Sequence, residues 1–283
     1  MVRGRQTNAS LHRKIAKAGL DSETQQRSCN TEGGEGALGL VSRSQNSNLI
    51  VTLPVYKDTG LLEKTADALQ EITPSISKDF ILLITEDGSN SSQIVERLRT
   101  KYRNIIYFQH DRRLGRGKAL REAWKKVQGN IYAYVDVDEA TDLTKLNAYA
   151  NLVNLQRDFD LVTGSRYIAA SVTARPWLRR TASIAYNWWV RMMFRTGVYD
   201  HQCGFKSFSH ELVERLAIEA KSDSWFWDTE VIVLARKLGF RVKEIPIYWA
   251  EKKGRRTPVK RLLKDIWLHG IGMLGLFYRI YIA

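Results

Sequence analysis

The sequence predicts an α/β domain built on a mainly parallel sheet with helices on both faces. Segments of strand length that are apolar throughout alternate with segments of helical periodicity, which is typical of strands buried on both sides. A chain of 283 residues with 44% hydrophobic content is long enough for one sizeable core. We expect one main domain over 48–255, after a polar and basic tail over 1–47 and before a basic, amphipathic segment over 256–283.

The elements of the first half share one pattern, a short apolar strand followed by a longer amphipathic helix. The strands are 49–53, 80–84, 105–109 and 131–135, and the helices are 61–72, 94–102 and 118–127. In the second half we expect helices at 181–194 and 229–238 and a strand at 241–249 that Pro246 interrupts. Ligands bind beyond the carboxyl ends of the strands in such sheets, so polar residues there are the candidates for function.

The first 47 residues are rich in Ser, Asn, Gln, Gly and basic residues, which predicts a mobile tail. Residues 11–20 within it have the spacing of a short helix. The tail carries charge but no apolar segment of the kind found in secretion signals. No uninterrupted apolar run of about 20 residues occurs in the sequence, so we expect no transmembrane helix.

The chain is strongly basic, with 44 Lys and Arg against 30 Asp and Glu and a formal net charge of +14. This excess indicates a negatively charged partner: nucleic acid, an anionic membrane surface or a phosphorylated substrate. Of its two cysteines, Cys29 stands in the tail and Cys203 in the body. That placement favours free thiols in a reducing compartment over a disulfide framework.

Asp136 and Asp138 directly follow the apolar strand 131–135. Because side chains alternate along a strand, both carboxylates can face the same way and offer hard oxygen ligands to Mg²⁺ or Mn²⁺. Such an ion would bridge a nucleotide's diphosphate and neutralise charge on that leaving group. The alternative is an acidic pair that only solvates a loop, and the buried strand before the pair favours the metal site.

Two further polar clusters stand at element ends. Glu86-Asp87-Gly88-Ser89 follows the strand 80–84, where a carboxylate could accept hydrogen bonds from a base or ribose; the alternative is a turn with an Asx interaction. Residues 113–119, Arg-Leu-Gly-Arg-Gly-Lys-Ala, enter a helix whose N-terminus suits a diphosphate. They lack the full P-loop pattern, and their alternative is a flexible basic loop.

Together with the second half of the chain, these pieces resemble the family 2 glycosyltransferases of the GT-A fold, and within them the dolichyl-phosphate mannosyltransferase branch. The resemblance runs from about residue 48 to 265. Its segments, in order, are Leu53-Pro54-Val55-Tyr56, Glu86-Asp87-Gly88-Ser89, Asp136-Val137-Asp138, Gly164-Ser165-Arg166-Tyr167, Arg179 with Ser183, Cys203-Gly204-Phe205-Lys206 and Trp227-Asp228-Thr229-Glu230.

The resemblance implies inverting transfer of a hexose, foremost mannose from GDP-mannose, onto a dolichyl-type polyprenyl monophosphate at the cytoplasmic face of a membrane. A UDP-glucose-dependent enzyme and one with a soluble acceptor are the alternatives. The implied residues are, for the donor nucleotide, Pro54, Tyr56, Asp58, Asp87, Lys118 and Asp136; for the metal, Asp136 and Asp138; for catalysis, Asp138, Arg166 and Asp228; and for the acceptor phosphate, Arg166, Arg179, Ser183 and Lys206. A lipid phosphate with a second pKa of about 6 is already largely a dianion at neutral pH, so no general base is required.

Some positions depart from the family pattern. Lys57-Asp58 replaces the usual Asn-Glu, Glu86 replaces an Asp, Ala140 replaces a Gln that helps to coordinate the metal, and Lys206 replaces an Arg. Asp228 has a simpler alternative as the N-cap of a helix beginning near Thr229, and Glu230 as a partner of that helix's dipole. These departures bear on the sugar and the nucleotide more than on the fold.

A basic cluster precedes the apolar, Trp- and Tyr-bearing stretch that ends at Ala283; it comprises Lys252, Lys253, Arg255, Arg256, Lys260, Arg261 and Lys264. We expect this segment to dock peripherally on an anionic membrane surface, extended by the apolar residues at 188–189 and 192–194. The alternative is a helix packed on the domain with a solvated basic face. Readings from other classes are a nucleic-acid-binding protein and an inactive scaffold; the acidic pair at 136 and 138 argues against the former, and no nucleic acid is expected as a partner.

Overall fold

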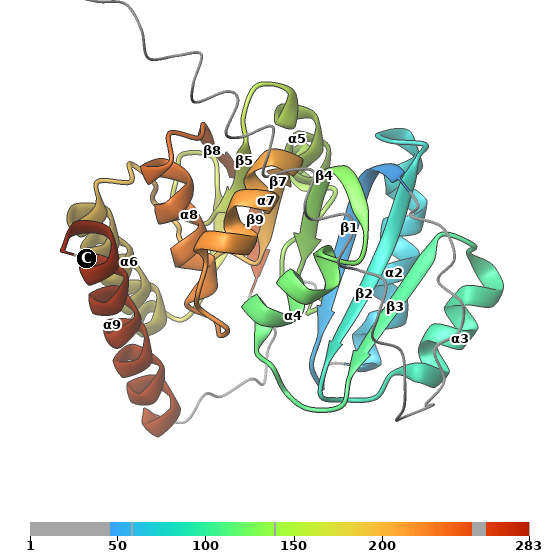
Figure 1. Ribbon diagram of the computed structural model, residues 1–283, viewed down its shortest axis with the longest axis horizontal. Coiled ribbons are helices and arrows are strands. Elements are labelled where there is room, and N and C mark those ends of the chain that lie inside the picture. The colour runs from blue at the N-terminus through green and yellow to red at the C-terminus, as the bar shows by residue number, and fades with distance from the viewer. Residues whose placement is uncertain (1–45, 58, 139, 251–258, 283) are drawn as a thin grey trace, which may run out of the picture. The chain divides into compact units, whose positions relative to one another are not determined.

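The computed structural model describes residues 46–57, 59–138, 140–250 and 259–282, without the side chains of 46, 47, 59 and 259–266. Within these ranges a seven-stranded sheet has the order β3-β2-β1-β4-β7-β5-β8 (Figure 1). Its strands are β1 (Asn46–Val55), β2 (Phe80–Asp87), β3 (Ile105–His110), β4 (Gln128–Val135), β5 (Leu161–Ser165), β7 (Phe205–Ser209) and β8 (Val242–Pro246). A small second sheet pairs β6 (Val172–Ala174) with β9 (Tyr248–Ala250).

In the first half of the chain the helices alternate with the strands as predicted; in the second half the helices at His210–Glu219 and Trp227–Lys237 follow each other with no strand between them. The helices are α2 (Thr59–Ile72), α3 (Ser92–Lys101), α4 (Arg116–Trp124), α5 (Ala148–Asn154), α6 (Trp177–Phe194), α7 (His210–Glu219), α8 (Trp227–Lys237) and α9 (Val259–Tyr281), with short 3₁₀ turns at Thr73–Ser75, Lys145–Asn147 and Leu155–Arg157. The strand predicted at 241–249 is divided between two sheets, because Pro246 ends β8 and β9 pairs elsewhere. The predicted tail, with residues 11–20, lies outside the described residues up to position 45.

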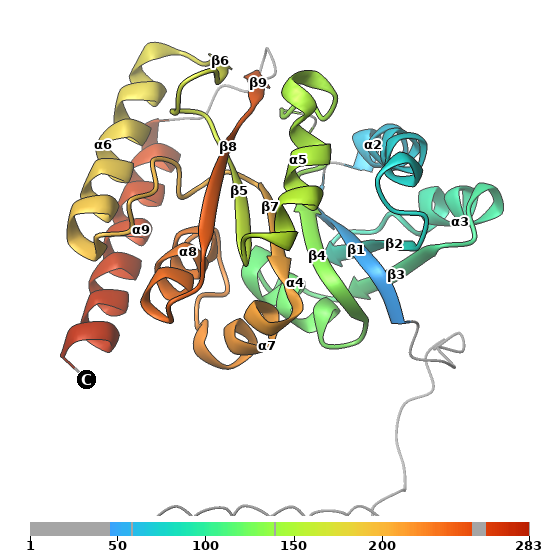
Figure 2. The same cartoon turned by 90° about the horizontal axis from the view of Figure 1, so that it is seen from above.

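Parallel pairing dominates the main sheet, which confirms the predicted class. β1 pairs in parallel with β2 and β4, β2 with β3, and β5 with β8, whereas β7 is antiparallel to both β4 and β5. Figure 2 shows α2, α3 and α5 on one face of the sheet and α4, α7 and α8 on the other. Side chains of β4 alternate between the two faces of the sheet. Tyr132 and Tyr134 pack with α4 and α8, and Ala133 and Val135 pack on the opposite face.

The strand order reverses at β1, and this reversal positions the site. The chain first adds β2 and then β3 on one side of β1, and then places β4 on the other side. The carboxyl ends of neighbouring parallel strands diverge at such a point and leave a crevice in which ligands bind. β1, β2 and β4 end there at Val55, Asp87 and Val135.

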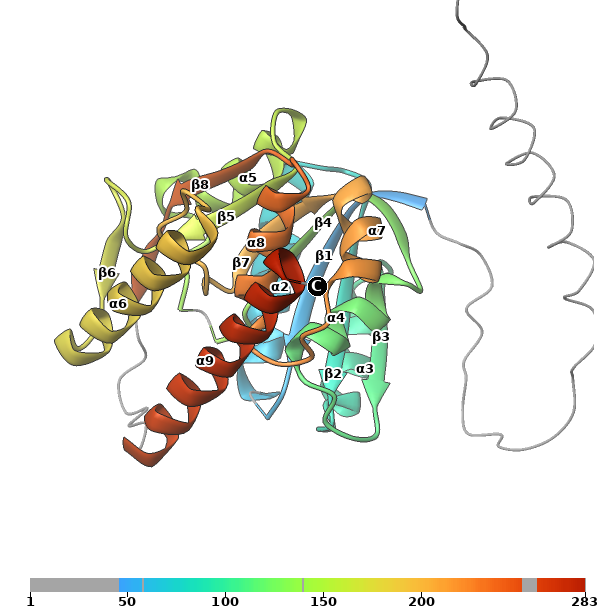
Figure 3. The same cartoon turned by 60° about the vertical axis from the view of Figure 1, so that its left-hand side comes forward.

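Two long helices, α6 and α9, stand at one edge of the molecule (Figure 3). They contact each other through Phe194 of α6 with Phe277 and Tyr281 of α9. Both also expose large apolar side chains, which are Trp177, Leu178, Ile184, Trp188, Trp189 and Met192 on α6 and Trp267, Leu268, Ile271, Leu274, Tyr278 and Tyr281 on α9. Along the described residues, no helix is both long and apolar enough to cross a membrane. The side chains of the predicted basic cluster lie outside the described residues.

Candidate active site

Two carboxylates and two cations meet beyond the carboxyl end of β4. The Arg116 guanidinium lies 2.6 Å from Asp136 Oδ1 and 3.2 Å from Asp228 Oδ2. Asp228 also accepts hydrogen bonds from the Lys206 ammonium, at 3.0 Å, and from the Tyr134 hydroxyl. Asp228 and Lys206 are buried, so these ion pairs form where water screens them little.

The backbone of residue 204 forms one wall around Asp136. The Asp136 N–H donates to the Gly204 carbonyl at 3.0 Å. A Cβ atom at position 204 would lie 1.8 Å from Asp136 Oδ2, which no real structure tolerates. Glycine is therefore required here for the carboxylate to keep its position.

The residues at the predicted metal position fit a divalent cation. Burial raises the pKa of Asp136 to about 7; Arg116 acts against this, whereas the nearby carboxylates of Asp138 and Asp228 add to it. Asp138 stands two positions beyond Asp136, and the two carboxylates would offer a divalent cation hard oxygen ligands. Among the described residues no group of three or more His, Cys, Asp or Glu side chains could hold a metal. Two carboxylates suffice for Mg²⁺, which keeps several waters and binds substrate phosphates.

The acidic residues at the end of β2 hold the loop that follows β3. Asp87 accepts hydrogen bonds from the backbone N–H groups of Leu114 and Gly115, the latter at 3.1 Å. Buried Glu86 accepts from Ser91 N–H at 2.7 Å and from the Tyr107 hydroxyl. The amides of the glycine-rich loop, which the sequence suggested for a diphosphate, therefore bind a carboxylate of the chain itself.

The other predicted donor residues lie in three separate segments, and Tyr56 is the one with a described contact to this loop. Pro54 lies in β1 beside Thr85 of β2. The Tyr56 ring lies 4.2 Å below the Arg113 guanidinium, so it contacts the same loop. Lys118 stands in the first turn of α4, where its N–H donates to the Asp223 carbonyl at 3.3 Å. Asp58 lies outside the described residues.

The predicted acceptor residues do not converge on one point. Arg166 is buried and forms a bidentate pair with Asp200, at 2.6 and 2.7 Å. Although burial alone would raise the pKa of Asp200, the Arg166 guanidinium holds it below its usual value. Arg179 and Ser183 lie one turn apart on α6, with the Ser183 hydroxyl buried. Lys206 is fully buried with its ammonium on Asp228, instead of facing an open phosphate site.

Asp228 is not the N-cap of α8. The helix begins at Trp227 with Phe226 as its N-cap, so Asp228 falls in the first turn. Its side chain turns toward Tyr134, Lys206 and Arg116. Glu230, on the same helix, accepts from the backbone N–H groups of Lys221 and Ser222 and pairs with Arg279 of α9.

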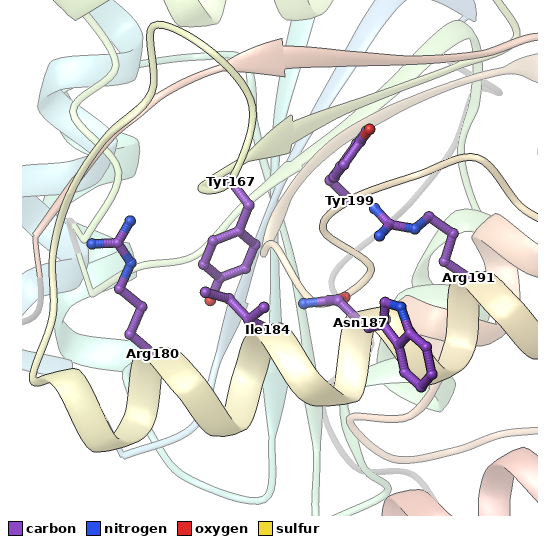
Figure 4. Close-up of a pocket in the computed structure, with 7 residues that line it drawn as sticks. Tyr167, Arg180, Ile184, Asn187, Arg191 and Tyr199 are labelled. Carbon is purple, nitrogen blue, oxygen red and sulfur yellow. The ribbon is translucent and has the colours of Figure 1, made fainter.

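A groove opens beside the loop that carries Arg166. Its volume is about 260 Å³, and it is lined by Tyr167, Arg180, Ile184, Asn187, Trp188, Arg191 and Tyr199. Figure 4 shows Arg180 and Arg191 at the two ends of the groove, with Ile184 and Asn187 between them on α6. Two guanidinium groups thus stand beside apolar and aromatic side chains.

Next to Asp200, His201 is buried in its neutral form. Asn187 Oδ1 accepts from both the His201 N–H, at 2.8 Å, and Nδ1, at 2.9 Å, while Nε2 accepts from the Thr196 hydroxyl at 2.9 Å. Burial lowers the pKa of His201 from 6.5 to about 3. The unfolded chain therefore takes up a proton that the folded chain does not, so stability is present above pH 6.5 and falls as the pH falls toward 3.

Replacing His201 by Gln should remove this acid sensitivity. Between pH 7 and pH 5 the free energy of unfolding of the wild type, measured with urea, should fall by about 2 kcal/mol more than that of the variant. The slope is about 1.4 kcal/mol per pH unit below the pKa of the unfolded chain. Comparing the two proteins cancels the contributions of other groups. Parallel pH dependences would show that the imidazole takes up its proton as readily in the folded state as in the unfolded chain.

Three residues of this region carried no sequence signal for their roles. Arg116 was visible only as part of a basic loop, and its partners are remote in sequence. The Trp225 ring, over which the Arg116 guanidinium lies at 3.7 Å, and Asp200 belong to segments without a recognisable pattern. A buried arginine without a partner costs free energy of folding. Asp200 could therefore have been found only by looking for a carboxylate partner of Arg166.

Sequence comparison assigns the family. The model of the family described as "Glycosyl transferase family 2" matches residues 50–220. Glycosyltransferase AglD of Haloferax volcanii is 36% identical over 234 residues, covering 81% of this chain and 37% of that protein. The human dolichyl-phosphate beta-glucosyltransferase is 25% identical over 244 residues, covering 80% and 75%. The chain thus spans little more than a third of the length of AglD.

Solved structures agree on the fold. Glucosyl-3-phosphoglycerate synthase from Mycobacterium tuberculosis, in complex with Mn²⁺, uridine diphosphate and glucosyl-3-phosphoglycerate, superposes with a TM-score of 0.59 at 15% identity, covering 81% of this chain and 80% of that chain. The mannosyltransferase PcManGT from Pyrobaculum calidifontis, in complex with GDP-Man and Mn²⁺, superposes with a TM-score of 0.53 at 17% identity, covering 90% of this chain and 68% of that chain. Family model, relatives and fold agree, and the chain belongs to glycosyl transferase family 2 with a GT-A fold.

Proposed function

We propose that this protein transfers a hexose from a nucleoside diphosphate sugar to a polyprenyl monophosphate. The observation that carries the proposal is the cluster of Asp136, Asp138 and Asp228 with Arg116 at the strand-order reversal. Family membership supports sugar transfer. Relatives that are named dolichyl-phosphate beta-glucosyltransferases, among them the human and yeast proteins, support a lipid phosphate as acceptor.

The reaction brings together two negatively charged groups, the diphosphate of the donor and the phosphate of the acceptor. Asp136 and Asp138 would hold a divalent cation, which when bound supplies positive charge to the departing diphosphate. Arg116 stands beside that position and can bind diphosphate oxygens bidentately. The acceptor phosphate is largely a dianion at neutral pH, so its oxygen can attack the anomeric carbon without a base. Holding the two anions in line is then the main task of the protein.

UDP-glucose is the donor that we favour over GDP-mannose. Several relatives are glucosyltransferases by name. Ala140, where the mannosyltransferase branch has a metal-coordinating Gln, points the same way. GDP-mannose, the donor that the sequence resemblance first suggested, remains the second candidate.

The groove on α6 fits the acceptor better than the four residues predicted for it. A polyprenyl phosphate needs cations for its headgroup and an apolar surface for its chain. Arg180 and Arg191 provide the first, and Trp188 with the exposed apolar residues of α6 provides the second. The same residues would hold this face of the protein against a membrane as a peripheral enzyme.

Replacing Asp138 by Asn should lower transfer by about 100-fold or more, because the cation loses a ligand and the leaving group its neutralisation. Purified protein is given radiolabelled UDP-glucose or GDP-mannose with dolichyl phosphate, vesicles and Mn²⁺, and label is counted in the organic extract. Asp111→Asn, an exposed acid outside the cluster, serves as the matched control and should keep full activity. Label from neither donor in the lipid, or label that stays in the aqueous phase, would overturn the lipid acceptor.

A further inference from the structure

The Arg116 side chain occupies a position that a cation needs. Its guanidinium is 2.6 Å from Asp136 Oδ1, and the side chain is only 10% exposed. Among the described residues, Arg116 is the one cationic side chain within ion-pair distance of Asp136. A divalent ion on the same carboxylate would face that guanidinium at close range, and two cations in so buried a place repel each other strongly.

We propose that Arg116 is an internal stand-in for the metal: it holds Asp136 in the donor-free enzyme, and the divalent cation displaces it as the donor binds. The proposal rests on the proposed function for the identity of the donor. Arg116 is then a positioning residue whose guanidinium moves from Asp136 to the donor's diphosphate. The cluster would thus keep a positive charge beside Asp136 at every stage.

The second carboxylate of the cluster permits this exchange. When Arg116 leaves, Asp228 keeps the Lys206 ammonium at 3.0 Å and the Tyr134 hydroxyl. Asp136, by contrast, loses the Arg116 guanidinium as its partner, while the backbone at Gly204 still packs against its carboxylate. Release of Arg116 therefore leaves Asp136 Oδ1 without its ion-pair partner and open to another cation.

The Arg116 side chain lies where its guanidinium could move from Asp136 to a bound diphosphate. Arg116 is the first residue of α4, at the end of a helix whose dipole favours an anion. Its guanidinium rests on the Trp225 ring at 3.7 Å, and that ring is half exposed, so this contact borders solvent. A diphosphate that binds beside Trp225 could contact the guanidinium, and bidentate binding would draw the guanidinium away from Asp136.

Direct Mn²⁺ binding without nucleotide tests the exchange, read from the electron paramagnetic resonance signal of free Mn²⁺. Arg116→Gln should bind Mn²⁺ about 10-fold more tightly than the wild type, because the competing charge is gone. Arg112→Gln removes an exposed arginine from the same segment and controls for the change in net charge; its affinity should stay within about 2-fold of the wild type. Arg116→Lys keeps the positive charge but not the planar guanidinium that binds a carboxylate bidentately, so its Mn²⁺ affinity should lie between those of the wild type and Arg116→Gln.

Nucleotide provides the second readout. Saturating UDP should raise the Mn²⁺ affinity of the wild type more than that of Arg116→Gln, because only the wild type has an internal competitor to remove. Equal or weaker Mn²⁺ binding by Arg116→Gln would overturn the proposal, and if that variant does not fold, Arg116→Lys binding no tighter than the wild type would do so. The measurement involves no acceptor, so failure of lipid transfer with competition intact would reject the lipid acceptor alone.

Discussion

Replacing Asp228 by Asn is expected to lower the free energy of unfolding by about 3–5 kcal/mol, which is the usual cost of breaking a buried ion pair from one side. The ammonium of Lys206 is fully buried, and Asp228 is the only carboxylate that the described residues place within 4 Å of it. An amide cannot neutralise that charge. Transfer should be lost as well, because Arg116 and Tyr134 lose their common partner. Urea denaturation and the lipid-transfer assay measure the two effects.

The double variant Asp228→Asn, Lys206→Met separates stability from activity. Removing the buried ammonium along with its partner should recover much of the lost stability, since an apolar side chain can replace a buried charge at little cost. Transfer should stay at the level of the single variant. A single variant as stable as the wild type would mean that the Lys206 ammonium reaches water or another partner, contrary to the arrangement described.

The second large effect is expected at Gly204. A methyl group there would lie 1.8 Å from Asp136 Oδ2, so Gly204→Ala must push the carboxylate out of place or shift the start of β7. We expect Mn²⁺ binding to weaken and transfer to fall by about 100-fold, since displacements of about 1 Å cost that much in a positioned site. Stability should fall by about 1–3 kcal/mol, as for other overpacked interiors.

Gly60→Ala is the matched control for this change. Gly60 lies in the first turn of α2, and a Cβ there would have no neighbour within 4 Å. This variant should be as stable as the wild type or more stable by up to about 1 kcal/mol, with full transfer. Wild-type Mn²⁺ binding by Gly204→Ala would show that Asp136 is not held against residue 204 in solution.

The basis of both predictions is a site assembled from separate segments. Arg116 comes from α4, Asp136 from the end of β4, Lys206 from β7 and Asp228 from α8. A change in any one leaves a buried charge without its counterpart. We therefore expect the effects of these residues on transfer to be strongly non-additive, as for groups that act as a unit.

The order of elements in the first half of the chain followed from the sequence alone, whereas the roles given to the residues at the strand ends stay predictions. Uniformly apolar segments of strand length predicted the parallel sheet, and the period of two along β4 predicted that residues 136 and 138 face the same way. Both inferences use neighbours within a few positions, where backbone geometry dictates direction. The helix ends were harder: α6 begins at Trp177, four residues before the expected start, because Pro176 precedes it.

Only the tertiary structure decided which charges meet. Arg116 and Asp228 are separated by 112 positions, and Tyr134 and Asp228 by 94. The pairing of Arg166 with Asp200, and the burial of Lys206 behind Asp228, likewise depend on how β7 and α8 pack against β4. A sequence motif names the residue types that a reaction needs. Whether a given cation faces solvent, substrate or a buried carboxylate depends on desolvation and on contacts made at long range, and neither is encoded in local spacing.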